Sequence, residues 1–241
     1  MKINIVCPII VLKNEANPDI RKSNLQKLML LVDKNNNLVN VEVNGNYTLK
    51  TILREKINSI INSNQFHLEQ VYTLGEEKYS YDSSIDVIYL SVTNIENIKE
   101  LSSDYKLIDF SISNNVINFS DKEYKFKTRE VISSNNIEYY HDILVNDIKL
   151  EKELLEILIA YKHLRSKIDY SDIIFKFMPK YFSLEEIRIL YEMIKEIRVD
   201  KSNFRKKIVK YCKEVDIDIV KKGYRPSKMY TFEVLKGDIW L

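Results

Sequence analysis

The pattern of apolar and polar positions changes once along the chain. Up to about residue 135, short apolar runs alternate with polar clusters, which is typical of β-strands and turns. From Ile148 onward, apolar residues recur every three or four positions, the spacing of amphipathic helices. The pattern therefore predicts a mainly β N-terminal part followed by a helical C-terminal part.

The N-terminal part is predicted to form a mixed sheet that carries helices. Leu and Ile residues at 3.6-residue spacing predict one helix over residues 47–62. Strands are expected at residues 3–13, 27–32, 38–43, 66–74, 85–92, 106–112 and 124–132. This order predicts an α/β (α+β) fold. We place the domain boundary in the polar stretch 133–147, which gives domains 1–145 and 146–241.

The C-terminal part contains the pattern around which the chain is organised. Apolar positions predict helices near residues 148–167 and 170–178, the second stopped by Pro179. Ser183 and Glu186 then have the spacing of a capping box at the start of a third helix. Asp200 is a suitable N-cap for a fourth, basic helix, only a short turn later. Two helices so closely linked indicate a helix-turn-helix.

The basic helix is predicted to bury one apolar face formed by Phe204, Ile208, Tyr211 and Cys212. Strands at residues 217–220 and 228–234, with a turn at Gly223 and Pro226, would follow as a wing. The candidate DNA-contacting side chains lie on the other face of the helix and on this wing: Lys201, Ser202, Asn203, Arg205, Lys206, Lys207, Arg225 and Lys228.

The second helix of such a pair enters the major groove, where its first turns meet base edges. Asn203 suits an adenine edge and Arg205 a guanine edge, each worth roughly 1–3 kcal/mol of discrimination. Arg225 and Lys228 would contact phosphates or a minor groove. A charged helix face is more often simply solvated. Here the order of cap, turn, basic helix and wing favours a winged helix that binds duplex DNA.

Charge is strongly polarised along the chain. The whole chain has a formal net charge of +2, whereas Arg198 to Lys228 contains eleven Lys or Arg and four Asp or Glu, a net of +7. The remaining residues therefore sum to −5, since 2 − 7 = −5. The positive patch coincides with the predicted DNA-binding helix and wing, which supports a nucleic-acid partner.

Other classes of protein are disfavoured. No apolar run approaches the roughly 18 residues that suggest a membrane helix, and the N-terminus does not resemble a signal peptide. The two cysteines and three histidines show no metal-site spacing, and no catalytic constellation stands out, so we expect no cofactor, metal or catalytic residue. We expect a cytoplasmic protein.

The chain resembles the Nudix-related transcriptional regulators of bacteria. The similarity is clearest from His141 to Phe232, in the segments 164–167 (LRSK), 173–179 (IIFKFMP), 181–184 (YFSL), 190–192 (LYE), 203–207 (NFRKK) and 225–230 (RPSKMY). The resemblance implies a Nudix-like mixed-sheet α/β/α sandwich followed by a C-terminal winged helix-turn-helix. It also implies a homodimeric repressor or activator that binds a double-stranded DNA operator and senses a nucleotide-type effector, ADP-ribose or NAD-like.

The predicted helix 47–62 departs from an active Nudix enzyme. Such enzymes hold Mg²⁺ against a diphosphate with clustered glutamates on one helix face. Arg54 and Glu55 match the motif, but Asn58 and Ser59 stand where further glutamates are needed. We therefore expect no hydrolysis. The alternatives are a Nudix-type hydrolase of nucleotide diphosphate derivatives such as ADP-ribose, and a sheet domain that only dimerises.

Overall fold

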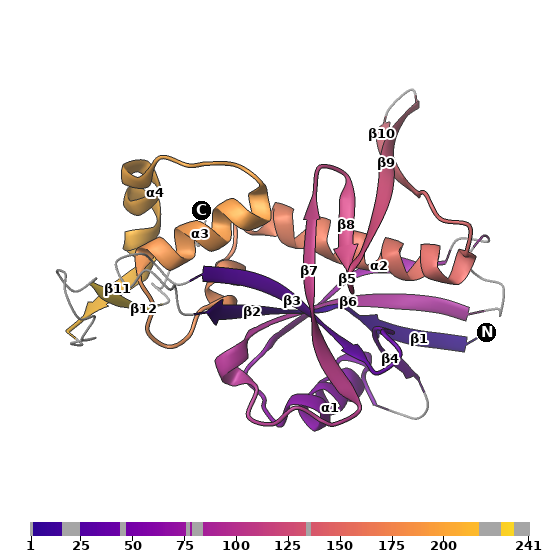
Figure 1. Cartoon of the computed structure of the whole chain (residues 1–241), viewed down its shortest axis with the longest axis horizontal. Helices are drawn as coiled ribbons and strands as arrows, with labels where there is room; N and C mark the ends of the chain where they lie inside the picture. Colours follow the sequence, from indigo (N-terminus) through magenta and orange to yellow (C-terminus); the bar gives the residue numbers. More distant parts are fainter. Residues whose placement is uncertain are drawn as a thin grey trace.

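The described residues of the N-terminal part form one large mixed sheet (Figure 1). The computed structural model describes residues 2–15, 25–43, 47–75, 78, 84–133, 136–216 and 228–233. The strand order is β10-β9-β8-β7-β3-β2-β6-β1-β4, with β5 paired to β6. The strands are β1 (Lys2–Cys7), β2 (Ile9–Glu15), β3 (Leu25–Asp33), β4 (Val39–Glu42), β5 (His67–Leu74), β6 (Ser84–Asn94), β7 (Tyr105–Ser113), β8 (Val116–Phe119), β9 (Lys122–Ser133) and β10 (Asn136–Ile143).

The long strand β6 is the centre of the sheet. β1 runs parallel to its first half and β2 parallel to its second half, while β5 pairs antiparallel along its other edge. The single strand predicted over residues 3–13 is therefore divided at Pro8. Proline has no N–H for the ladder and a fixed φ, so it interrupts the strand, and its carbonyl oxygen accepts a hydrogen bond from Ser91 N at 3.1 Å.

Helices cover both faces of this sheet (Figure 1). Helix α1 (Leu49–Ile61), close to the predicted range, packs Leu53, Ile57 and Ile60 onto one face. Helix α2 (Ile148–Lys167) lies on the opposite face, where its leucines join the core formed by Val6, Ile88 and neighbouring side chains. Alternate residues of each strand thus belong to different cores, as the pleat requires.

Strands β8 and β10 were not predicted from the sequence, and β8 lies between two tight turns. Asn114 and Asn115 between β7 and β8 have φ of 50° and 61°, and Ser120 and Asp121 between β8 and β9 have φ of 52° and 61°. Positive φ at both central residues is the mark of type I′ turns, and Asn favours them. Strand β10 lies inside the predicted boundary stretch 133–147, so that stretch is partly sheet rather than linker.

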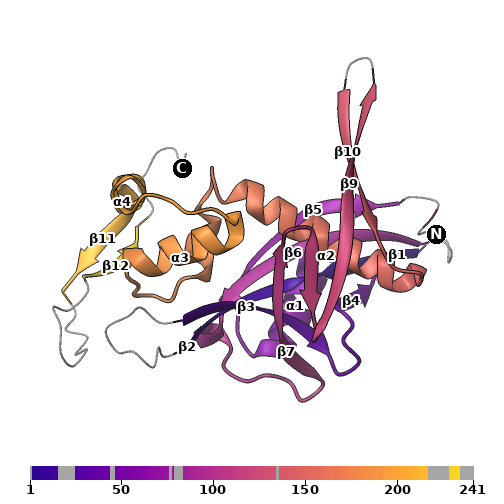
Figure 2. The ribbon, with the colours of Figure 1, turned by 45° about the horizontal axis from the view of Figure 1, so that its top comes forward.

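The β9–β10 hairpin projects away from the body of the molecule in both views (Figures 1 and 2). Most residues of β9 up to Arg129 are exposed, with Phe126 as its buried residue. A strand that leaves the sheet in this way has no continuous buried face, so the alternation by which strands are predicted is weak. The hairpin ends in a short connection that leads to α2.

The C-terminal elements sit at one end of the sheet (Figure 1). The predicted helix 170–178 is instead the 3-10 helix η3 (Asp172–Phe177), which fits a short segment that ends before Pro179. It is followed by α3 (Leu184–Lys195), α4 (Lys201–Ile208), the 3-10 turn η4 (Val209–Tyr211), β11 (Cys212–Val215) and β12 (Met229–Phe232); a further short 3-10 turn, η2 (Ile95–Asn97), follows β6.

The described part of the wing is a ribbon of β11 and β12, which pair antiparallel. Cys212 therefore starts a strand instead of lying on the basic helix. The predicted strand 217–220 and the predicted turn residues Gly223, Arg225 and Pro226 lie outside the described residues. Within those residues, no helix is both long and apolar enough to cross a membrane. The division of the chain at 145/146 stays a prediction, since α2 shares a core with the sheet.

Candidate nucleic-acid interface

Helix α3 forms the first half of the helix-turn-helix. Ser183 is its N-cap: Ser183 Oγ accepts from Glu186 N at 3.3 Å, and Glu186 Oε2 accepts from Ser183 N at 2.7 Å. This confirms the predicted capping box. Ile187, Leu190 and Ile194 are fully buried. Their burial fixes the rotation of α3 about its axis, and with it the point at which the chain leaves for α4.

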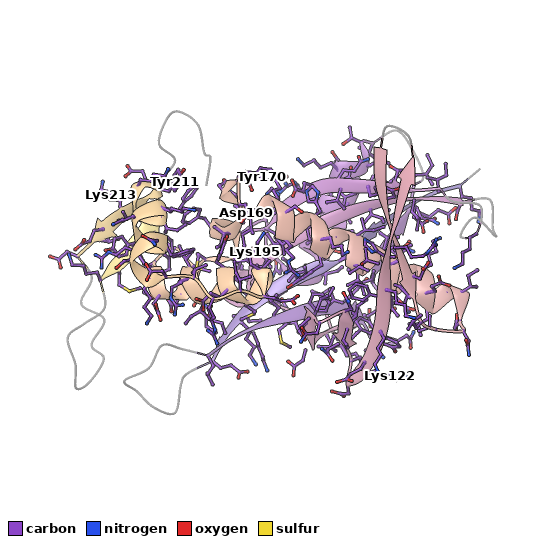
Figure 3. All side chains as sticks on the ribbon, turned by 90° about the horizontal axis from the view of Figure 1, so that it is seen from above. Lys122, Asp169, Tyr170, Lys195, Tyr211 and Lys213 are labelled. Atoms are coloured by element: carbon purple, nitrogen blue, oxygen red, sulfur yellow. The ribbon has the colours of Figure 1, made fainter. Side chains whose placement is uncertain are left out.

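Asp169, just after α2, anchors α3. Lys195 Nζ donates to Asp169 Oδ2 at 2.6 Å, and Tyr191 Oη donates to Asp169 Oδ1 at 2.9 Å. Figure 3 shows Asp169 and Lys195 together beside the end of α2. Burial, together with the hydrogen bond to Asp169, raises the pKa of Tyr191 to about 12. The helix pair is therefore tied by polar contacts to the helix that covers the sheet.

The turn between α3 and α4 is organised by one buried carboxylate, Glu192. Its Oε1 accepts from Val199 N at 3.0 Å and its Oε2 accepts from Arg198 Nη1 at 2.9 Å, while Arg188 bonds it from the preceding turn of α3. Burial would raise the pKa of Glu192, but the Val199 N–H and the two arginines together hold it below its ordinary value. An ionised Glu192 thus holds both sides of the turn.

Helix α4 presents a basic face to solvent. Asp200 is its N-cap, as predicted, and accepts from Asn203 N at 2.8 Å. Phe204 and Ile208 are buried, and the Phe204 ring lies 5.3 Å from that of Tyr191. The other side chains of the helix are exposed: Lys201, Ser202, Asn203, Arg205, Lys206 and Lys207. The structure therefore exposes six of the eight predicted DNA-contacting residues on α4, and we call this solvent-exposed part of the helix the α4 face.

The charge of the α4 face is largely uncompensated. Lys201 Nζ lies 3.3 Å from Glu185 Oε1, but that lysine side chain is 73% exposed. Arg188 is the stronger partner of Glu185 and the main cause that holds the pKa of Glu185 below its ordinary value. Within the described part of the chain, Arg205, Lys206 and Lys207 have no ion-pair partner. They remain available to an external polyanion.

The wing extends from the same body. Phe182 N donates to Tyr230 O at 3.0 Å and Tyr230 N to Phe182 O at 2.8 Å, so the residue before Ser183 adds a third chain to the β11–β12 ribbon. Phe232 stacks on Phe175 of η3 with ring centroids 4.3 Å apart. Lys228, the seventh predicted contact, is exposed at the loop end of the β11–β12 ribbon and pairs with Glu214 at 2.6 Å. Arg225 lies outside the described residues.

The position that corresponds to a Nudix site lies at α1, on the face of the sheet opposite α2. A cavity of about 310 Å³ is lined by Arg54, Glu55 and Asn58, among others. Glu55 is exposed, Arg54 lies over the Phe66 ring with its Cζ 5.1 Å from the centroid, and Asn58 Nδ2 donates to Asn64 Oδ1 at 2.8 Å.

These residues do not fit a catalytic Mg²⁺ ion. Such an ion is held by carboxylates together with the substrate's phosphates. Glu55 supplies the cavity's one carboxylate among the described residues. Across the same described ranges, no three His, Cys, Asp or Glu side chains gather as a metal site.

Comparison with known proteins decides the nature of the C-terminal part. Residues 174–232 match the NrtR DNA-binding winged helix domain. These residues form an NrtR-type winged helix domain. The α4 face belongs to this NrtR-type domain, and so does the β11–β12 ribbon. A comparison with curated protein sequences finds no significant match.

Solved structures share the fold of nearly the whole chain. A MutT/nudix family protein from Enterococcus faecalis has a TM-score of 0.65 at 16% identity, covering 97% of this chain and 88% of its own. Shewanella oneidensis NrtR complexed with a 27mer DNA has a TM-score of 0.65 at 14% identity, covering 96% and 93%. A further structure of Shewanella oneidensis NrtR has a TM-score of 0.63 at 13% identity, covering 97% and 94%. The predicted fold, a Nudix-like sheet domain joined to a winged helix, is confirmed.

Three contributors to the NrtR-type domain were missed from the sequence. Glu192 and Arg188 hold the inter-helix turn, and Phe182 extends the wing ribbon. The sequence does contain one indication, because Glu192 follows Arg188 by four residues and lies among the apolar positions of α3. A carboxylate at such a position needs a buried partner.

Proposed function

We propose that the chain is a transcriptional regulator that acts in the cytoplasm and binds duplex DNA as a homodimer. In this proposal α4 enters the major groove, and the wing, including Lys228 and Arg225, contacts the backbone. The observation that carries it is the α4 face, a helix of the NrtR-type winged helix domain whose exposed side chains include four cations and no acid. Such a face matches the negative potential of a duplex.

Base reading is assigned to Asn203 and Arg205. Both are exposed within the first two turns of α4, the region of such a helix that meets base edges. Selection of bound DNA from a random pool would give the operator. The double variant Asn203→Ala plus Arg205→Ala should then lose sequence preference while retaining non-specific affinity. Unchanged preference would remove these residues from recognition.

A matched control is available at the far end of the molecule. Lys122 is an exposed cation at the start of β9, well away from the winged helix (Figure 3). Lys122→Ala removes the same charge as a lysine variant on α4 and should leave operator binding unchanged. Equal losses for Lys122→Ala and for α4 variants would indicate a general charge effect.

The homodimer is part of the same proposal. A winged helix of this kind reads two half-sites when two copies are held one or more helical turns apart, so a selected operator should be an imperfect palindrome. Light scattering on the full chain, free and with operator, measures the number of copies. A single copy bound to a non-repeated site would contradict the dimer.

We infer that the sheet domain senses a ligand and does not hydrolyse one. A nucleotide-type effector, ADP-ribose or NAD-like, bound at the α1 cavity would change the spacing of the two α4 helices and hence the affinity for DNA. Thermal unfolding with ADP-ribose, NAD and sugar phosphates tests this, because a ligand that binds the folded state raises the midpoint. No shift with any of them would leave the domain as a dimerisation platform.

The alternative, a hydrolase of nucleotide diphosphate derivatives, has its own test. Mg²⁺-dependent release of AMP or phosphate from ADP-ribose, abolished by Glu55→Gln, would establish it. We expect no such release, because one exposed carboxylate cannot hold the ion in the required geometry.

A further inference from the structure

A second cavity lies on the face of the sheet opposite α1. It has a volume of about 400 Å³ and is bounded by strands β1, β4 and β6 and by helix α2, with Asn4, Asn40, Asp86, Lys152, Glu153 and Glu156 in its wall. Asn4 and Asp86 lie on the strand face of Val6 and Ile88, whereas the α1 cavity belongs to the other face. The two cavities are therefore separate. This one is within the size range of small-molecule sites.

The inner wall of this cavity contains two buried carboxyl groups and one amino group. Asp86 is 2% exposed; it pairs with Lys152 and accepts a hydrogen bond from Asn4 Nδ2 at 3.0 Å. Glu156, one helical turn after Lys152, is 4% exposed. Among the described residues, Glu156 Oε1 has no hydrogen-bond partner. The ammonium of Lys152 thus pairs with Asp86, and among the described residues Glu156 has no cation of its own.

The unpartnered Glu156 carboxyl group destabilises the folded protein. A buried polar atom without a partner is destabilising, and a buried carboxylate without a counter-charge is more so. Burial raises the pKa of Glu156, and its hydrogen bond with Asp86 raises it further, so the cavity favours the protonated form of Glu156. The unpartnered Oε1 then points to a missing hydrogen-bond donor.

The rest of the wall is also rich in acids. Burial raises the pKa of Glu153 as well, although its Oε1 accepts from Leu38 N at 2.9 Å. Asp33 is satisfied by the backbone N–H groups of Asn35 and Asn37, and Lys149 lies at the exposed rim. In total, four carboxyl groups and two lysines line the cavity: Asp33, Asp86, Glu153 and Glu156 with Lys149 and Lys152.

We propose that this cavity binds a small molecule that carries a primary ammonium group, with the ammonium seated against Glu156. A second cation beside Lys152 matches the two buried carboxyl groups one to one. It donates to the unpartnered Oε1 and allows Glu156 to ionise. An anionic group such as a phosphate would instead face the acid excess. The asparagines and Lys149 remain to bind polar atoms elsewhere on the ligand. The site does not depend on DNA binding.

Binding is therefore coupled to proton release. When the ammonium enters, the neutral Glu156 carboxyl loses its proton to solvent, while the ligand remains protonated. The neighbouring groups that set this step are Asp86 on β6 and Lys152 and Glu153 on α2, with Asp33 at the end of β3. An uncharged ligand of the same shape supplies no counter-charge for an ionised Glu156, so its binding should not release that proton.

The test compares putrescine with 1,4-butanediol, which has hydroxyl groups in place of the two ammonium groups. Isothermal titration of the full chain at pH 5.5, in phosphate and in acetate buffer, gives affinity and proton release together. Putrescine should bind at least tenfold more tightly than butanediol and should release a proton. Equal affinity for the two probes, or binding of neither, would overturn the proposal.

Variants locate the site. Glu156→Gln keeps the shape of the side chain but cannot ionise, so it should weaken putrescine at least tenfold and abolish proton release. Glu151→Gln, on the same helix but outside the cavity, should change affinity by less than twofold. Circular dichroism shows whether each variant is folded. Full putrescine binding with proton release in Glu156→Gln would place the ammonium elsewhere.

Discussion

Asn94 donates a hydrogen bond from its Nδ2 to the backbone carbonyl oxygen of Phe177 at 2.7 Å, and both residues are buried. Asn94 ends β6, the central strand of the sheet, and Phe177 ends η3, which leads into the winged helix. The same Asn94 uses Oδ1 to accept from Glu96 N at 3.0 Å. The Asn94 side chain therefore links the central strand of the sheet to η3, at the start of the NrtR-type domain.

Removal of this amide should destabilise the junction. Asn94→Ala leaves the buried Phe177 carbonyl without its donor, which typically costs about 1–3 kcal/mol. Urea unfolding measures this loss. Asn118→Ala, which removes an exposed 3.0 Å bond to Ser111 Oγ, should change the free energy of unfolding by less than about 0.5 kcal/mol. Equal effects of the two substitutions would mean that the buried Asn94–Phe177 bond contributes no more to stability than the exposed Asn118–Ser111 bond.

An ionic contact between β5 and the end of α2 predicts a pH dependence of stability. Glu69 on β5 lies against Lys167 at the end of α2 and near His67 and His163. Burial alone would raise the pKa of Glu69, but the neighbouring His67 and Lys167 side chains lower it to about 2.

A carboxyl group whose pKa is lowered by folding stabilises the folded state above its unfolded pKa, and this contribution is lost as the pH falls through the folded value. The stability should therefore decline between about pH 5 and pH 2. Glu69→Gln should flatten this part of the profile in urea unfolding, while Glu123→Gln, an exposed glutamate on β9, should not. An unchanged slope in Glu69→Gln would remove Glu69 as its source.

The α4 face predicts how DNA affinity depends on salt. Each phosphate contact releases condensed counterions, so the slope of log K against log salt reports the number of contacts. Loss of both Lys206 and Lys207 to Ala should reduce that slope by about 2, with little change in sequence preference. Operator binding between low and moderate salt measures it, with Lys122→Ala as the control. A flat salt response in the unsubstituted protein would argue against the α4 face as the contact surface.

Local rules explain what the sequence could predict. The capping box at Ser183 and the N-cap at Asp200 depend on residues within one helical turn, and both are present. The exposure of Arg205 and Lys206 follows from the helical spacing of Phe204 and Ile208. The α4 surface was therefore predictable before any tertiary contact was known.

Tertiary pairing explains most of what was missed. β10 is defined by its pairing with β9, and β11 is defined by its pairing with β12 from across the wing. The Asn114–Asn115 turn was recognisable, because Asn tolerates the positive φ of a type I′ hairpin. The burial of Glu156, by contrast, could not be predicted from the sequence, because it results from the packing of α2 against the sheet.

Glu192 offers the sharpest test of how the helix pair is held. Its side chain is 5% exposed and bonds Arg188, Arg198 and Val199 N across the turn before α4. Glu192→Gln should cost about 3 kcal/mol of unfolding free energy, the lower end of the range for a broken buried pair, since Arg198 is exposed. It should also weaken operator binding, because the entry of α4 is no longer fixed relative to α3.

Glu185→Gln is the matched control for Glu192→Gln, since Glu185 lies on the same helix and also bonds Arg188. Its carboxylate is 35% exposed, so its pairs should contribute less than about 1 kcal/mol. Urea unfolding separates the two variants, and operator binding of Glu192→Gln at a temperature where it is folded, with Lys122→Ala as the binding control, isolates the effect on α4. If Glu192→Gln lost stability but bound the operator normally, the carboxylate would support the fold without setting the position of the DNA-contacting helix.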